Sequence, residues 1–255
     1  MAKGNISPMK TTKNTILVTG GSAGIGFEIA KLFAANHNTV IITGRDKLRL
    51  QRAATELTNV TPIVGDVTNA EQVDELVRKL EKHFPSLNVV INNAGKAWLH
   101  NLSLDNGTFE KAADEIQTNY LSVVRLNERL LPLLKQQKDA AIVNVSSIVA
   151  FSPNHRMSTY GASKAALHSY TQSLRLALSR TSNIKVFEVM PPLVNTDFSQ
   201  AIGGANGISP ETVAKELMGA FMTDHYEIHI GKTAYIYELS RTSPAEALLA
   251  MNPSL

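Results

Sequence analysis

Two side chains in the segment 159–164 have types and spacing that suit acid–base chemistry. Tyr160 and Lys164 are four residues apart, so they lie on one face if this segment is helical. A free tyrosine has a pKa of about 10, and about 4 kcal/mol of differential stabilisation of the phenolate would bring that pKa within reach of neutrality. A lysine ammonium beside it, in a site shielded from water, could supply this energy. The pair is a candidate proton donor and acceptor, although the same spacing also occurs by chance on helix surfaces.

A glycine-rich loop between an expected strand and an expected helix is a second candidate. Residues 15–19 form a β-branched run that predicts a buried strand, and apolar spacing predicts a helix over residues 27–35. The loop reads Gly20-Gly21-Ser22-Ala23-Gly24-Ile25-Gly26. Glycines let a backbone come close to phosphates, and the positive end of the helix faces them. A plain tight turn would also use glycine, but the order strand, loop, helix favours nucleotide binding.

The end of the next expected strand, residues 39–43, bears on which nucleotide is bound. An acidic residue at this position would hydrogen-bond an adenosine ribose, whereas Arg45 could hold a 2′-phosphate. This favours NADP(H) over NAD(H). Alternatively, Arg45 is solvated and Asp46 caps the following helix. After a third strand at residues 60–64, Asp66 either contacts the adenine or ends the strand.

Strands and helices are expected to alternate along the rest of the chain. Further strands are expected at residues 87–91, 141–145, 184–190 and 227–230. Helices are expected at residues 47–57, 68–84, 109–136, 158–178 and 235–251, with another beginning at Pro210 and an interruption near Pro132. This order predicts a single α/β domain over residues 15–255: a doubly wound Rossmann-type parallel sheet of about seven strands with helices on both faces.

Composition excludes several classes of protein. The chain has 255 residues, of which 44% are hydrophobic and 18% charged, as in ordinary soluble globular proteins. The net charge of +3 is spread along the chain, which argues against a nucleic-acid groove. The absence of cysteine excludes disulfides and thiolate ligands and suits a cytoplasmic location. No metal site is expected, and no apolar run reaches the ~20 residues of a membrane span. Residues 1–14 are expected to form a flexible N-terminal arm.

These features together resemble the short-chain dehydrogenase/reductase family over nearly the whole chain. Residues 19–26 fit its cofactor motif, and the Asn-Asn-Ala-Gly run at residues 92–95 fits its sheet-stabilising motif. Its four catalytic positions correspond to Asn119, Ser147, Tyr160 and Lys164. Residues 190–197 and 230–233 are similar to the branch containing the oxidoreductase associated with D-alanylation of bacterial teichoic acids. That similarity points to a bacterial source and carries no information on the substrate.

The resemblance implies a role for each catalytic position. Tyr160 would donate a proton to a carbonyl oxygen in reduction or remove one from an alcohol in oxidation. Ser147 would hydrogen-bond that oxygen as charge develops on it. Lys164 would lower the pKa of the tyrosine and hold the nicotinamide ribose, and Asn119 would anchor a water that links Lys164 to solvent. The hydride itself belongs to the cofactor.

The same resemblance implies the cofactor contacts. The residues concerned are Gly20, Ser22, Gly24, Ile25, Gly26, Arg45, Asp66, Val67, Asn93, Ala94, Gly95, Tyr160, Lys164, Val194 and Thr196. Two positions depart from the common pattern. Pro192 stands where the family usually has glycine and Ala150 where glycine commonly follows the serine pair. Because Pro192 lacks an N–H group, its effect on the cofactor site stays open.

The expected function is an NADP(H)-dependent oxidoreductase that interconverts a carbonyl and a secondary alcohol on a small molecule. The alternatives are an NAD(H)-dependent alcohol dehydrogenase of the same family and a non-catalytic dinucleotide-binding regulator. Residues 197–209 are expected to form a loop that closes over the substrate, although an ordinary connection would look the same. Side chains that could line a partly apolar pocket are Trp98, Leu99, Phe151, His155, Met157, Leu193 and Phe198. A homodimer or homotetramer is expected from the resemblance.

Overall fold

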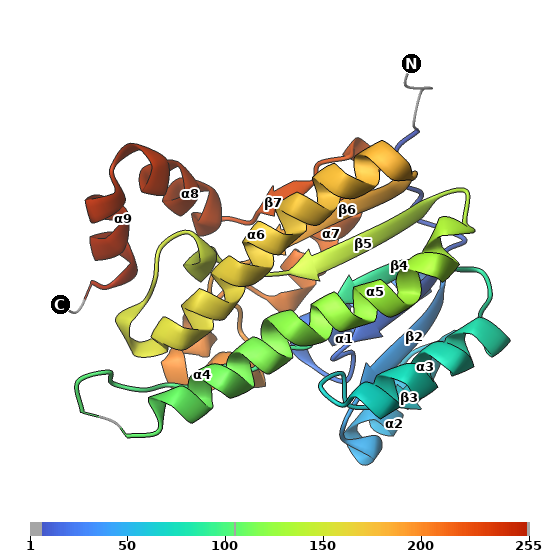
Figure 1. Ribbon diagram of the computed structural model, residues 1–255, viewed down its shortest axis with the longest axis horizontal. Helices are drawn as coiled ribbons and strands as arrows, with labels where there is room; N and C mark the ends of the chain where they lie inside the picture. The colour runs from blue at the N-terminus through green and yellow to red at the C-terminus, as the bar shows by residue number, and fades with distance from the viewer. Residues whose placement is uncertain (1–6, 105, 254–255) are drawn as a thin grey trace.

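A seven-stranded, all-parallel sheet forms the centre of the molecule (Figure 1). The structure is a computed structural model that describes residues 7–104 and 106–253. The strands are β1 (Thr15–Thr19), β2 (Thr39–Gly44), β3 (Val60–Val64), β4 (Leu87–Asn92), β5 (Ala140–Val145), β6 (Ile184–Met190) and β7 (Glu227–His229). Their order across the sheet is β3-β2-β1-β4-β5-β6-β7. The order reverses between β1 and β4, which is where doubly wound sheets bind ligands. The predicted fold is confirmed.

Helices cover both faces of this sheet (Figure 1). One face packs against α1 (Gly24–Ala35), α2 (Lys47–Thr55) and α7 (Pro210–Thr223), and the other against α3 (Ala70–His83), α5 (Ser122–Lys135) and α6 (Ser158–Thr181). Strands β1, β5 and β6 are buried along their full length. This explains their nearly continuous apolar sequences, because a parallel sheet covered on both faces has no solvated side.

The segment between β4 and β5 differs from the expectation. Here α4 (Thr108–Ile116) passes through a π-helical turn, Gln117–Leu121, into α5. The predicted interruption near Pro132 is wrong, since Pro132 lies inside α5. Its ring is exposed, as is Glu128 one turn earlier, so solvent can satisfy the carbonyl that loses its partner. The irregularity instead surrounds Asn119, whose side chain bonds to a distant segment of the chain.

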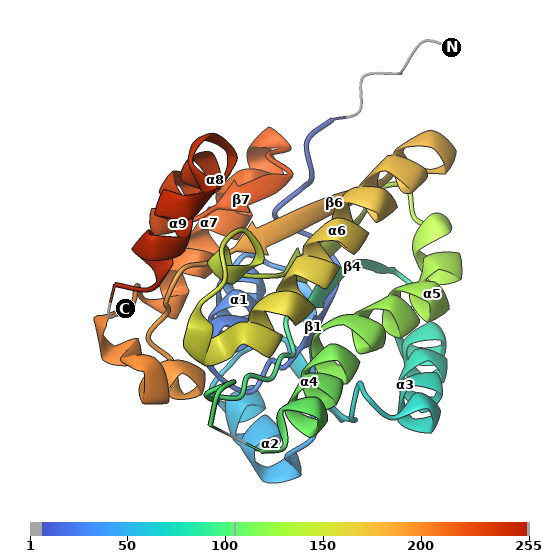
Figure 2. The same ribbon diagram turned by 60° about the vertical axis from the view of Figure 1, so that its left-hand side comes forward.

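The C-terminal region contains two helices rather than the single helix expected over residues 235–251. These are α8 (Lys232–Thr242) and α9 (Pro244–Met251), and they pack against each other beyond β7 (Figure 2). The chain breaks at Ser243, whose backbone leaves the helical region. Pro244 explains the break, because proline cannot donate the next helical hydrogen bond but suits the first position of a new helix.

The N-terminal segment is held against the body over its described part. Met9 is buried in the core, and the backbone carbonyl of Ser7 accepts a hydrogen bond from Lys185 Nζ. Residues 7–14 therefore differ from the flexible arm expected over residues 1–14, of which residues 1–6 lie outside the described residues. None of the helices within residues 7–104 and 106–253 combines the length and apolar character needed to cross a bilayer.

Candidate active site

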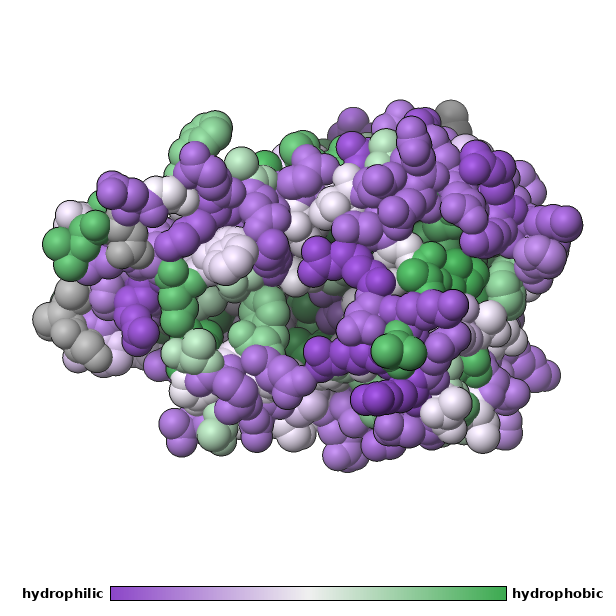
Figure 3. Space-filling view, turned by 90° about the horizontal axis from the view of Figure 1, so that it is seen from below, coloured by the Kyte–Doolittle hydropathy of each residue, from purple (hydrophilic) through white to green (hydrophobic). Residues whose placement is uncertain are grey.

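A pocket of about 660 Å³ lies at the carboxyl ends of the central strands. Its walls come from the loops after β1, β4, β5 and β6 and from the first turns of α6. Seen from below, the surface is hollowed near its middle, and apolar residues lie inside the hollow (Figure 3). Pockets of this size hold small organic ligands and cofactors.

The glycine loop forms one half of this pocket. Gly20 and Gly24 have φ angles of 65° and 56°, values that favour glycine. A Cβ atom on Gly26 would collide with Asn93 Nδ2 and with the Gly20 carbonyl oxygen. Helix α1 starts at Gly24, earlier than expected, and no side chain caps its N-terminus. Its first N–H groups are therefore open to a ligand, which suits a pyrophosphate.

The residues after β4 tie that strand to the glycine loop. Thr19 Oγ1 accepts hydrogen bonds at 3.0 Å from the backbone N–H groups of Asn93 and Ala94. The side chain of Asn93 donates to the carbonyl oxygens of Thr19 and Gly20. Asn93, Ala94 and Gly95 line the pocket. Ser22, a predicted phosphate contact, instead lines a second, smaller depression on the α2 side.

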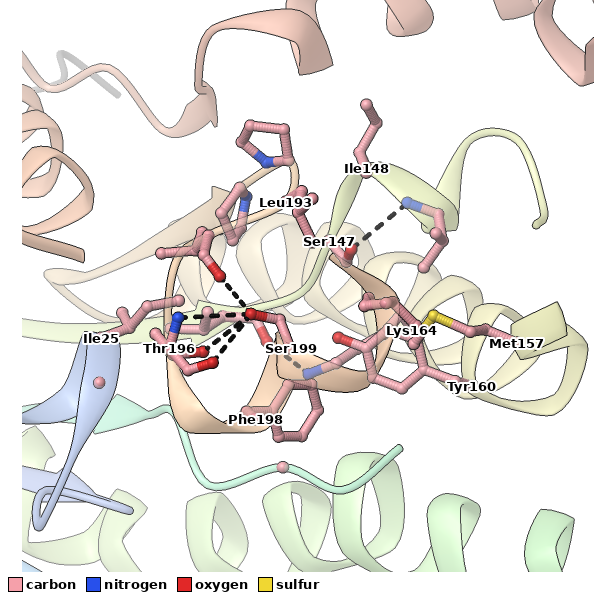
Figure 4. A pocket seen from close by; sticks show the side chains of 18 of the residues that line it. Ile25, Ser147, Ile148, Met157, Tyr160, Lys164, Leu193, Thr196, Phe198 and Ser199 are labelled. Atoms are coloured by element: carbon pink, nitrogen blue, oxygen red, sulfur yellow. Dashed lines mark hydrogen bonds between the residues drawn. The ribbon is translucent and has the colours of Figure 1, made fainter. Parts of the chain in front are cut away.

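Ser147, Tyr160 and Lys164 meet in the other half of the pocket (Figure 4). Tyr160 and Lys164 lie in the first two turns of α6, with Lys164 Nζ 5.7 Å from the centre of the Tyr160 ring. The Lys164 ammonium donates a hydrogen bond of 2.8 Å to the Val145 carbonyl oxygen. All three side chains are buried. Three of the four predicted catalytic residues thus share one pocket.

Burial dominates the acid–base properties of this pair. It raises the pKa of the Tyr160 phenol above its ordinary value, and a hydrogen bond with Ser147 partly offsets this. Burial lowers the pKa of Lys164 to about 8. The expected lowering of the Tyr160 pKa by Lys164 is not seen here, because the ammonium bonds to the Val145 carbonyl and desolvation of the phenol prevails.

The side chain of Asn119 is held by hydrogen bonds within the protein, and its role as a water anchor stays a prediction. Its Oδ1 accepts from the Lys96 N–H at 2.8 Å, and its Nδ2 donates to the Lys96 carbonyl at 2.8 Å and to Ser163 Oγ at 2.9 Å. The side chain is fully buried. It therefore joins the loop after β4 to α6, with both N–H groups of its amide in use.

The predicted adenosine contacts lie outside this pocket. Arg45 is largely exposed, and its Nη1 is 4.0 Å from Asp66 Oδ2. Asp66 Oδ1 accepts from the backbone N–H and the hydroxyl of Thr68, so it closes a turn, and Val67 is buried. Sequence reasoning missed Arg49, which lines the pocket and pairs with Asp197 at 2.5 Å. A second arginine one helical turn after Arg45 was the available signal.

The segment after β6 forms part of the pocket wall. Val194 and Thr196, the predicted nicotinamide contacts, line it, and a Cβ atom on Gly24 would lie 3.0 Å from Thr196 Cγ2. Residues 197–209 contain the 3₁₀ segments Asp197–Ile202 and Gly204–Asn206. Phe198 projects from the first of these, and its ring centre lies 6.1 Å from that of Tyr160 (Figure 4). Pro192 lines the pocket, and Ala150 ends a short 3₁₀ turn, Ile148–Ala150.

Some of the residues predicted to line the substrate side do not reach the pocket. Met157, Leu193 and Phe198 line it, whereas the pocket walls do not include Trp98, Leu99, Phe151 and His155. The indole of Trp98 bonds to Asp114, and Phe151 packs against His168, His229 and Tyr237. Arg156 lines the pocket, and no ion pair within the described residues holds its guanidinium.

Two buried acids near the pocket were also missed. Glu115 of α4 is fully buried, and its Oε1 accepts from the Trp98 N–H at 2.6 Å. Glu188 of β6 is fully buried beside Ser146 and His168. A glutamate within the mostly apolar strand 184–190 was an available signal for Glu188. Glu115 carried no such signal, because a glutamate in a helix is ordinary.

Comparison with known proteins shows which sequences this chain is similar to. A family model for the short chain dehydrogenases matches residues 14–207. The uncharacterized oxidoreductase DltE of Bacillus subtilis is 40% identical over 210 residues, which is 82% of each chain. An uncharacterized oxidoreductase of Staphylococcus epidermidis is 31% identical over 192 residues, 75% of this chain and 82% of the relative.

Solved structures share the fold. A short-chain dehydrogenase/reductase from Burkholderia phymatum, in complex with NAD, has a TM-score of 0.85 at 20% identity and covers 96% of this chain and 98% of its own. A short chain dehydrogenase from Burkholderia cenocepacia, in complex with NADP, has a TM-score of 0.82 at 25% identity and covers 95% and 98%. With a family model that spans most of its sheet and a relative of this identity, the chain belongs to the short-chain dehydrogenase/reductase family of oxidoreductases.

Proposed function

We propose that this protein uses a nicotinamide dinucleotide, with preference for NADP(H), to interconvert a carbonyl group and a secondary alcohol. The observation that carries the proposal is the meeting of Ser147, Tyr160 and Lys164 in one pocket with an uncapped glycine loop. The loop suits the pyrophosphate of the cofactor, and the three side chains suit a reacting oxygen. The complexes of two neighbours with NAD and with NADP support this cofactor class.

Each side chain has a task that follows from its surroundings. Tyr160 holds its proton because burial raises its pKa, so it acts as the acid when a carbonyl is reduced. Ser147, which lines the same pocket and lowers the pKa of the phenol, would stabilise the same substrate oxygen. Lys164 is cationic below about pH 8 and would favour the phenolate left after proton transfer. The bound dinucleotide would supply or accept the hydride.

The substrate half of the pocket favours a partly apolar compound. Ile148, Met157, Leu193, Phe198 and Ile202 form its walls. Arg156 adds one cation to this lining, which would tolerate an acidic group on the substrate. The remaining parts of the proposal are a cytoplasmic location and a homodimer or homotetramer.

Tyr160→Phe tests the proposal. We expect this variant to bind NADPH as the wild type does and to lose about 10²- to 10⁴-fold in turnover, because only the acid–base hydroxyl is removed. A panel of carbonyl and alcohol substrates, followed by NADPH absorbance, gives the turnover, and calorimetry gives the affinity. Tyr170→Phe is the matched control, since it removes a hydroxyl from the same helix at a position outside the pocket.

Three results would count against the proposal or a part of it. Equal turnover in wild type and Tyr160→Phe would remove Tyr160 from the mechanism. Dinucleotide binding without turnover of any substrate in the panel would favour the alternative of a non-catalytic regulator. Faster turnover with NADH than with NADPH would favour the NAD(H)-dependent alternative.

A further inference from the structure

Strand β6 carries a carboxylate inside the protein. Glu188 is fully buried, and Ser146 Oγ donates a hydrogen bond of 2.5 Å to its Oε1. The ring nitrogen Nδ1 of His168 lies 2.9 Å from Oε2 and 3.1 Å from Oε1. Burying a carboxylate costs several kcal/mol unless partners compensate it. The other charged residue of this strand, Lys185, pairs with Asp224, whereas Glu188 in the same mostly apolar strand needs an explanation beyond packing.

Helix α6 and strand β5 connect the surroundings of Glu188 with those of Lys164. His168 follows Lys164 by one turn of α6, so both side chains leave the same face of the helix. Lys164 Nζ bonds to the carbonyl of Val145, the residue before Ser146. In the sheet, Asn144 and Val145 are the partners of Glu188 and Val189. The ammonium and the carboxylate thus occupy the space between α6 and the ends of β5 and β6.

We propose that Glu188 and His168 are a positioning pair for the proposed active site, in which the buried carboxylate holds Lys164 in its ammonium form and the imidazole fixes the carboxylate. The catalytic consequence of this inference rests on the proposed function. Burial alone lowers the pKa of Lys164, and the charge of Glu188 acts in the opposite direction. Glu188 also raises the pKa of His168 through their hydrogen bond.

Other charged groups around this pair do not replace Glu188. Arg175 of α6 and Glu227 of β7 pair with each other at 2.7 Å. Burial lowers the pKa of His229 of β7, which favours its neutral form. On the far side, Glu115 of α4 acts on the Tyr160 phenol and raises its pKa. Glu188 is the carboxylate that counters the burial of Lys164.

The pKa of Lys164 in the cofactor-free protein tests the inference without any reaction. It can be followed by NMR of lysine labelled with ¹³C at Cε, with the Lys164 signal assigned by its loss in Lys164→Met. We expect Glu188→Gln to lower this pKa by about one unit or more below the wild-type value, since a facing opposite charge is removed. The amide keeps the size of the side chain and an acceptor for Ser146.

Two further variants separate charge from structural damage. Glu188→Asp keeps the charge and should leave the pKa of Lys164 nearer the wild-type value than Glu188→Gln does. His168→Gln keeps the carboxylate and offers it an amide N–H donor in place of the imidazole, so it should not lower the pKa of Lys164. Loosening of the site would hydrate Lys164 and raise its pKa toward the ordinary value of 10.5. An unchanged or raised pKa in Glu188→Gln, or a lowered one in His168→Gln, would overturn the inference. If Glu188→Gln does not fold, the His168→Gln result decides.

The pH dependence of turnover then tests the link to catalysis. If Lys164 must be charged, kcat/KM for carbonyl reduction in Glu188→Gln should decline at a lower pH than in the wild type, by the shift that NMR measures. A shift of the Lys164 pKa without a shift of this profile would contradict the role of Lys164 in the proposed function. It would leave the charge coupling between Glu188 and Lys164 intact.

Discussion

Arg45 and Arg49 are two arginines shortly after the end of β2, and they differ in what holds them. Arg45 is largely exposed and lies at the limit of an ion pair with Asp66, whereas Arg49 pairs with Asp197 across the pocket mouth. We expect Arg45→Ala to weaken NADPH binding by about 10- to 100-fold, because charge-assisted hydrogen bonds contribute about 1.5 to 3 kcal/mol. NADH binding should change little, since NADH lacks the 2′-phosphate.

Fluorescence titration of both dinucleotides measures this difference. Arg129→Ala is the control, since it removes an exposed arginine that pairs with Asp74 far from the pocket. Equal losses for NADPH and NADH in Arg45→Ala would contradict the 2′-phosphate role. Loss of NADPH binding in Arg49→Ala alone would assign that role to the arginine that sequence reasoning missed.

At this scale the sequence predicted residues whose neighbours are local. Tyr160 and Lys164 share a helix face, so their spacing alone was informative. Arg49, Glu188 and the hydrogen bonds of Asn119 depend on segments that are far apart in the chain. Nothing in the residues beside them indicates these partners, because tertiary packing decides them.

Elements were predicted where a local pattern determines them. Strands β1 and β6 have the bounds expected, since strands buried on both faces are mostly apolar. Helix ends and helix breaks were predicted less accurately than strands. Pro132 is tolerated because solvent reaches the backbone beside it, while Pro244, next to a non-helical Ser243, separates two helices. The same residue type thus has opposite effects that local sequence does not distinguish.

Gly26→Ala tests whether the glycine loop tolerates a side chain at this position. We expect this variant to lose measurable dinucleotide binding and to melt at a lower temperature, because its Cβ would collide with Asn93 and with the Gly20 carbonyl that the loop requires. Calorimetric titration and thermal melting give both values. Gly219→Ala in α7 is the matched control, since no atom lies within 4 Å of its Cβ position.

The control has its own expected outcome. Alanine should stabilise α7 by about 0.5 to 1 kcal/mol, because glycine inside a helix costs conformational entropy. Dinucleotide affinity should stay at the wild-type value in Gly219→Ala. Unchanged dinucleotide binding in Gly26→Ala would mean that the loop can shift to accommodate a side chain. The close contact between Gly26 and Asn93 would then not be required for binding.

Across the whole molecule, the two ends of the sheet have separate tasks. The pocket occupies the carboxyl ends of the strands. At the amino ends, Asn38 accepts from the Asn14 backbone and side chain, and it donates to the carbonyls of Thr11 and Phe33. Asn88 continues this network by bonding to Thr15 and Asn14. The network joins β1, β2 and β4 and holds the segment before β1 in place.

Asn38→Ala should therefore lower stability without changing the proposed chemistry. It leaves several buried backbone groups unpaired, each at a cost of about 1 to 3 kcal/mol, so we expect a loss of about 3 kcal/mol or more in the free energy of unfolding. Urea unfolding measures this loss, and dinucleotide affinity should stay unchanged because the pocket lies at the other end of the strands. Asn36→Ala, which loses one bond to its own helix, should cost about 1 kcal/mol. If Asn38→Ala weakened dinucleotide binding while its stability stayed at the wild-type level, the two ends of the sheet would not be independent.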